Sequence, residues 1–81
     1  MVKVTVAVDG MMCGMCEAHV NDAIRKAFNV KKVDSSRSKK QTVILAEEPL
    51  DEQKVLDTIN ATGYEAKSIK TEPYEKKGLF H

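Results

Sequence analysis

Residues 2–16 read VKVTVAVDGMMCGMC, and the rest of the chain can be understood outward from them. Valine occupies every second position at the start, at Val2, Val4, Val6 and Val8. This alternation predicts a half-buried strand that reaches Asp9, because successive side chains of a strand point to opposite faces. Gly10 then completes a turn signal, and beyond Cys16 the apolar residues follow the spacing of one helix face. We therefore expect a helix from about Gly14 to Phe28.

A hairpin of two strands is expected next. Asn29 is predicted to end the helix as a left-handed cap. One strand is predicted from Asn29 to about Arg37, and the β-branched run Gln41–Ala46 predicts the other. The polar turn between them, residues 37–40, contains no glycine.

The segment after the hairpin carries the signals of a second helix. Asp51 can serve as its N-cap, and Leu50 and Val55 occupy the two positions of a hydrophobic staple. Gly63 is expected to stop the helix. The predicted helix thus lies between Asp51 and Gly63.

A last strand, from Tyr64 to about Thr71, completes the order strand, helix, strand, strand, helix, strand. This is the βαββαβ pattern of a ferredoxin-like α+β sandwich. The one-sided alternation in the strands favours a four-stranded antiparallel sheet with both helices on one face. We expect residues 1–71 to form this single domain and the tail, residues 72–81, to be disordered.

Length and composition exclude several classes of protein. The 81 residues suffice for one small domain. A net charge of +1, with 31% charged residues of both signs, gives no indication of nucleic-acid binding or of attraction to anionic membranes. The N-terminus lacks the continuous apolar run of a signal peptide or a membrane span. Two cysteines with a two-residue gap suit reversible or metal-binding chemistry in a reducing compartment, so we expect a cytoplasmic protein.

Sulfur-containing side chains gather at the predicted loop. Residues 11–16 hold both cysteines, Cys13 and Cys16, and three of the four methionines. In the first turn of a helix, unpaired N–H groups and the helix dipole favour the thiolate and lower a thiol pKa below its usual value of about 8.5. The pair therefore predicts two thiolates near neutral pH.

The ligand count favours a soft ion that is only partly enclosed. A closed structural zinc site takes four ligands, whereas beyond the cysteine pair the chain offers His19, His81 and carboxylates. Two thiolates suit Cu(I) better. Incomplete coordination leaves room for a third thiolate from another protein, which favours carriage over storage. The same Cys-x-x-Cys spacing occurs in thioredoxin-like redox proteins, but the absence of Trp and Pro beside this pair argues against redox work.

Residues 10–16, GMMCGMC, fit the Gly-Met-x-Cys-x-x-Cys signature of the heavy-metal-associated domain, and Gly63-Tyr64-Glu65 fits its later half. Over about residues 2–70 the chain resembles stand-alone bacterial copper chaperones of that family and the N-terminal modules of copper-exporting P-type ATPases. The resemblance implies that Cys13 and Cys16 bind Cu(I) in a near-linear geometry.

The resemblance also implies roles for three neighbouring residues. Gly10 would provide the sharp turn of the loop, and Met11 would point inward as a packing residue. Tyr64 would stand near the metal site; the alternative is that it is simply the buried first residue of a strand. Transfer would proceed by docking on a matching domain of a copper-transporting P-type ATPase or a copper-responsive repressor, followed by exchange of thiolates.

Two positions depart from the common pattern of the family. Met15 lies where many bacterial relatives have histidine, and we expect it, like Met12, at the exposed rim instead of binding the metal. His19 lies one turn after Cys16 on roughly the same side of the helix. It is either an exposed helix residue or a third ligand that would move the preference toward Zn(II) or Cd(II).

The sequence therefore predicts a Cu(I) metallochaperone that is not an enzyme. The first alternative keeps the fold but carries Zn(II), Cd(II) or Hg(II), and a further one is a thiol–disulfide oxidoreductase. We expect a monomer without nucleic-acid binding or membrane insertion, in which shared Cu(I) could bridge two copies.

Overall fold

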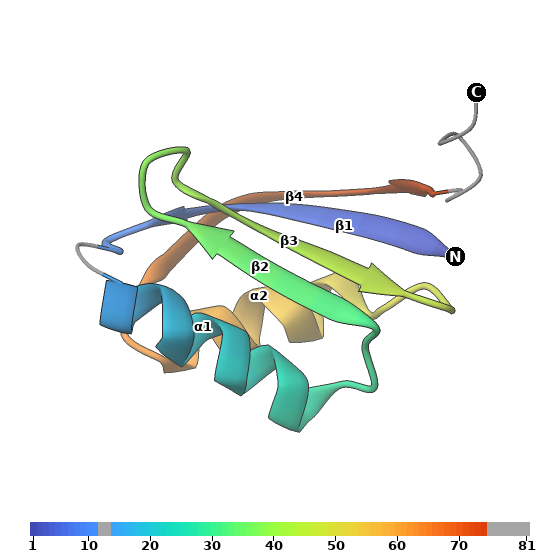
Figure 1. The fold of residues 1–81 in the computed structure, drawn as a ribbon, viewed down its shortest axis with the longest axis horizontal. Helices are drawn as coiled ribbons and strands as arrows, with labels where there is room; N and C mark the ends of the chain where they lie inside the picture. The colour runs from blue at the N-terminus through green and yellow to red at the C-terminus, as the bar shows by residue number, and fades with distance from the viewer. Residues whose placement is uncertain (12–13, 75–81) are drawn as a thin grey trace.

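The computed structural model describes residues 1–11 and 14–74. In chain order the described elements are β1 (Val2–Asp9), α1 (Gly14–Ala27), β2 (Lys32–Ser36), β3 (Gln41–Ala46), α2 (Glu52–Ala61) and β4 (Glu65–Pro73). The strands form one sheet in the order β2-β3-β1-β4, and each neighbouring pair is antiparallel. Both helices cover the same face of the sheet (Figure 1). The predicted ferredoxin-like α+β sandwich is confirmed.

The core lies between the sheet and the two helices. From the central strand β1, Val4 and Val6 are fully buried. They belong to one cluster with apolar side chains of both helices, namely Val20, Ile24, Val55 and Ile59. Burial of each such side chain stabilises the fold by about 1.5–3 kcal/mol. The alternation of valines in β1 therefore determines which face the helices cover.

A polar cluster ties α1 to the hairpin inside this core. The Ser35 hydroxyl in β2 donates a 2.7 Å hydrogen bond to Asn21 Oδ1 of α1 and lies 2.9 Å from Thr42 Oγ1 of β3. Ser35 and Thr42 are both buried. Because a buried hydroxyl without a partner costs free energy, these contacts hold α1 in one position on the sheet.

The second helix begins and ends as predicted. Asp51 is the N-cap, and its Oδ1 accepts hydrogen bonds from the backbone N–H groups of Gln53 and Lys54 at 3.1 and 3.3 Å. Past the last turn, Gly63 has a φ of +100° and donates a 3.1 Å hydrogen bond to the Asn60 carbonyl. A glycine in the left-handed region directly after a helix is the usual C-terminal stop.

The prediction of a left-handed cap at Asn29 was wrong. Among the described residues other than glycine, only Lys40 has a positive φ, at 55°. It closes the β2–β3 turn, and its carbonyl accepts a 2.9 Å hydrogen bond from the Val8 N–H. The β2 strand also starts later than expected, at Lys32, since residues 29–30 lead from the end of α1 to the first pairing with β3 at Lys31.

The last strand is longer than predicted. β4 continues to Pro73, which pairs with Val2, and the Tyr74 N–H donates to the Met1 carbonyl at 3.0 Å. Proline is tolerated because β4 is an edge strand. The tail expected at residues 72–81 therefore does not begin at residue 72, and residues 75–81 lie outside the described part of the chain.

Candidate metal centre

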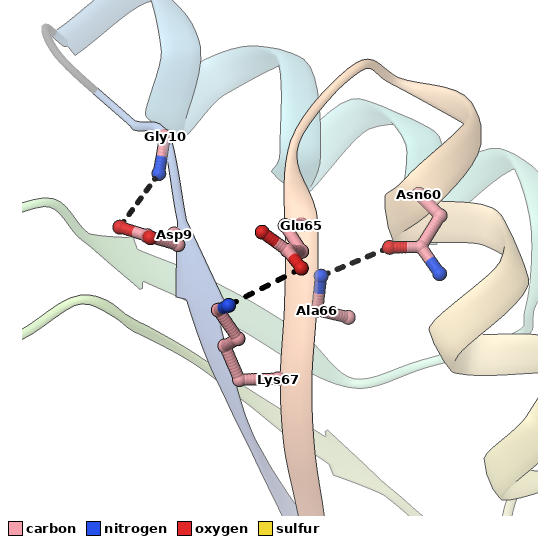
Figure 2. Close-up of polar contacts among 6 residues, drawn as sticks. All are labelled: Asp9, Gly10, Asn60, Glu65, Ala66 and Lys67. Atoms are coloured by element: carbon pink, nitrogen blue, oxygen red, sulfur yellow. Dashed lines mark hydrogen bonds and ion pairs between the residues drawn. The ribbon is translucent and has the colours of Figure 1, made fainter.

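The chain leaves β1 through a turn at Gly10. Its φ of +101° lies in the region that favours glycine, and its N–H donates a 3.2 Å hydrogen bond to the Asp9 side chain. Figure 2 shows this side chain folded back toward the Gly10 nitrogen. A Cβ on Gly10 would lie 3.5 Å from the ring atom Cδ1 of Tyr64. The turn and the ring of Tyr64 therefore lie side by side, and the position of Tyr64 near a bound metal stays a prediction.

The start of β4, which follows Tyr64, is fixed from two sides. The Ala66 N–H donates a 2.9 Å hydrogen bond to Asn60 Oδ1 at the end of α2, as drawn in Figure 2. A bulge between Ala7 and Val8 lets β1 and β4 pair on both sides of Lys67. Bulges bend a strand and increase its twist. Tyr64 is thus held beside the loop by α2 and by the irregular end of β4.

The three described sulfur side chains of the loop region have different surroundings. Met11 is 8% exposed and belongs to the hydrophobic core, in agreement with the inward packing expected of it. Met15 is 69% exposed, as expected for a rim residue. Cys16 is half-buried in the first turn of α1 and packs against the core cluster. The other predicted site residues, Met12 and Cys13, lie outside the described residues.

His19 is exposed on α1, one turn beyond Cys16. Within residues 1–11 and 14–74, no group of three or more His, Cys, Asp or Glu side chains is placed to hold a metal ion. The described part of the chain therefore does not gather His19 with Cys16 and a carboxylate into a three-ligand site.

Sequence reasoning missed Arg37, which the fold brings to the start of α1. Its backbone N–H donates a 2.6 Å hydrogen bond to Glu17 Oε2, and its Nη1 lies 3.5 Å from the position of a Cβ on Gly14. The strand order could have indicated this position of Arg37. β1 and β2 are both antiparallel to β3, so they run in the same direction and end at the same edge of the sheet. The turn after β2 must lie at the same edge as the first turn of α1.

A family model of the heavy-metal-associated domain matches residues 5–65, from within β1 to the start of β4. The chain belongs to the heavy-metal-associated domain family. The match includes both cysteines and each of the residues that the resemblance placed around them, Gly10, Met11 and Tyr64.

Solved structures of this family's fold resemble the chain closely. A "CopZ metallochaperone" is 23% identical, with a TM-score of 0.74 over 80% of this chain and 98% of its own. A copper-binding domain from HMA7, a P-type ATPase, is 26% identical, with a TM-score of 0.75 over 83% and 92%. Oxidised MerP from Ralstonia metallidurans CH34 is 32% identical, with a TM-score of 0.71 over 86% and 99%. No curated protein sequence matched the chain.

The helices of this heavy-metal-associated domain are short. Among the residues described, neither helix is long and apolar enough to cross a membrane. The first helix begins at Gly14, within the sulfur-rich residues 11–16, so Met15 and Cys16 lie in its first turn.

Proposed function

We propose that this heavy-metal-associated domain is a cytoplasmic Cu(I) carrier in which Cys13 and Cys16 hold the ion. The observation that carries the proposal is the place of Cys16, half-buried in the first turn of α1 and next to the exposed Met15. Cys13 precedes it by three residues. Two thiolates at a helix N-terminus are suited to a soft monovalent cation.

Transfer in this proposal is a redox-neutral exchange of ligands. A thiolate of the partner forms a bond to Cu(I), and one of the two thiolates of this chain leaves it; a second exchange completes the transfer. The similarity to a copper-binding domain of a P-type ATPase supports a partner with the same fold. The copper-responsive repressor remains a second candidate partner. In either case the chain acts as a carrier and not as an enzyme.

Competition with a Cu(I) chelator tests the proposal. The reduced protein should bind one Cu(I) tightly, and Cys13→Ser, Cys16→Ser and the double variant should each abolish that binding. Met15→Leu is the matched control, since it removes an exposed sulfur from the same turn and should leave the affinity unchanged. Tight binding that persists in the double variant would overturn the proposal. Native mass spectrometry of the same samples reports whether the ion bridges two copies.

A divalent ion is the second candidate cargo. The specific observation in its favour is that His19 is exposed on α1 one turn after Cys16, where a metal held at the helix start could recruit it. An imidazole as third ligand suits Zn(II) better than Cu(I). The two cargoes differ in the effect expected when His19 is removed.

A further inference from the structure

Arg37 makes two contacts with the first turn of α1. Its backbone N–H is bound to Glu17 Oε2 at 2.6 Å. Its guanidinium Nη1 lies 3.5 Å from the position of a Cβ on Gly14. Gly14 follows Cys13 directly and precedes Cys16 by two positions. The hydrogen bond fixes the main chain of the turn, and the side chain of Arg37 reaches Gly14, one of the two residues between the cysteines.

Among residues 1–11 and 14–74, no carboxylate forms an ion pair with the guanidinium of Arg37. The ion pairs formed within the described ranges are Asp22–Arg25, Lys31–Glu47, Glu65–Lys67 and Lys70–Glu72. The carboxylate of Glu17 lies in the first turn of α1, and its negative charge offsets part of the positive charge of Arg37 there. This carboxylate accepts the backbone N–H of Arg37 and does not pair with the guanidinium. The guanidinium of Arg37 is thus available to interact with the charge of a metal complex formed at the start of α1.

The cargo determines that charge. Two thiolates that hold Cu(I) carry one net negative charge, whereas the same two thiolates with Zn(II) are neutral. Both complexes form from the same metal-free protein, so the difference between them does not depend on how the thiols were protonated beforehand. A nearby cation stabilises the anionic complex and leaves the neutral one almost unaffected.

We infer that Arg37 is a specificity-determining residue that biases the metal site toward a monovalent ion over a divalent one. The inference rests on the proposed function, because it takes the cysteine pair as the site of binding. It adds that the selectivity comes partly from the β2–β3 turn, which contributes charge without contributing a ligand. The same turn supplies the comparison for a test, since it also carries the exposed Lys39.

Lys39 is the matched control. It has the same charge as Arg37 and lies two residues further along the turn, but its backbone N–H donates to Ser36 Oγ at 3.2 Å instead of to α1. Its side chain lines grooves that also include Gln41 and belong to the face of the sheet that the helices leave open. Lys39→Gln therefore removes the same charge from the same turn without changing the surroundings of Gly14.

The experiment measures Cu(I) and Zn(II) affinities of the full reduced chain by chelator competition, for the natural chain and for Arg37→Gln, Arg37→Lys, Arg37→Glu and Lys39→Gln. Arg37→Gln should lower the ratio of Cu(I) to Zn(II) affinity by about twofold to fivefold, the range of an exposed charge interaction. Arg37→Glu should lower it further, Arg37→Lys should retain most of it, and added salt should reduce the effect.

The outcomes distinguish failure of the role of Arg37 from failure of the proposed function. An unchanged ratio in Arg37→Gln, or an equal fall in Lys39→Gln, would overturn the role of Arg37 while leaving the carrier intact. Failure of the natural chain to bind Cu(I) through its cysteines would overturn the proposed function and the inference with it. Arg37 is exposed and every variant keeps the backbone N–H that binds Glu17, so thermal unfolding should confirm an unchanged fold.

Discussion

The ring of Tyr64 lies against Gly10, with Cδ1 3.5 Å from the position of a glycine Cβ. Gly63, next to Tyr64 in the chain, has nearly the same backbone conformation, with a φ of +100° compared with +101° at Gly10. Apart from its two chain neighbours, no atom in the described part of the chain lies within 4 Å of a Cβ on Gly63. The two glycines therefore share the same conformational requirement, but only Gly10 adjoins the ring beside the sulfur-rich loop.

Substitution of each glycine by alanine separates these two properties. Gly10→Ala and Gly63→Ala should each lower the free energy of unfolding by about 1–2 kcal/mol, because an L side chain is strained in the left-handed region. Urea unfolding measures this loss. Only Gly10→Ala should also weaken Cu(I) binding. The strained backbone at position 10 would relax by displacing the residues that lead from this turn to the cysteines. Equal Cu(I) affinities in the two variants would show that the Gly10 turn does not position the loop for metal binding.

Ser35 should be the polar core residue most sensitive to substitution. Ser35→Ala removes the hydroxyl that joins Asn21 to the fully buried Thr42, and we expect a loss of about 1–3 kcal/mol in unfolding free energy. The double variant Ser35→Ala with Thr42→Val should lose less than the sum of the single variants, because no hydroxyl is then left buried without its partner. Ser38→Ala, in the exposed turn, is the control and should change stability little. Strict additivity would contradict the coupling.

Much of the fold could be predicted because its signals are local. The alternating valines, the capping Asp51 and the positive-φ Gly63 each act within a few residues, and the structure places all three as expected. The left-handed residue at Lys40 could not be predicted in this way. Its conformation closes a hairpin, and its carbonyl is used by Val8 on another strand. Such a requirement depends on pairing between distant segments.

The residues of the candidate site also differ in whether local sequence or the pairing of distant segments indicates them. Cys13, Cys16, Gly10 and Met11 belong to one short motif, so the sequence alone predicts them as site residues. Arg37 comes from a turn that only the order of strands brings to the start of α1, so no spacing along the chain indicates it. Only the strand order, which places the end of β2 at the same edge of the sheet as the end of β1, could have indicated Arg37.

Loss of the α2 N-cap should affect stability without affecting the metal. Asp51→Ala removes the acceptor for the N–H groups of Gln53 and Lys54 and should cost about 1 kcal/mol in unfolding free energy. α2 begins after β3, at the end of the sandwich opposite the start of α1 (Figure 1). Cu(I) affinity should therefore be unchanged. Glu48→Ala, an exposed residue just before the helix, is the control. A parallel fall in Cu(I) affinity would mean that metal binding follows global stability.

Removal of His19 tests whether this side chain is a ligand to a divalent cargo. If the ion is held by Cys13 and Cys16 alone, His19→Ala should leave both Cu(I) and Zn(II) affinities within about twofold of the natural chain, because the described residues gather no three-ligand group around this exposed side chain. Lys26→Ala, exposed near the end of α1, controls for a general change in the helix. Competition with chelators measures both affinities. A fall of about tenfold or more in Zn(II) affinity alone, equivalent to about 1.4 kcal/mol, would identify His19 as a ligand and favour a carrier of divalent ions.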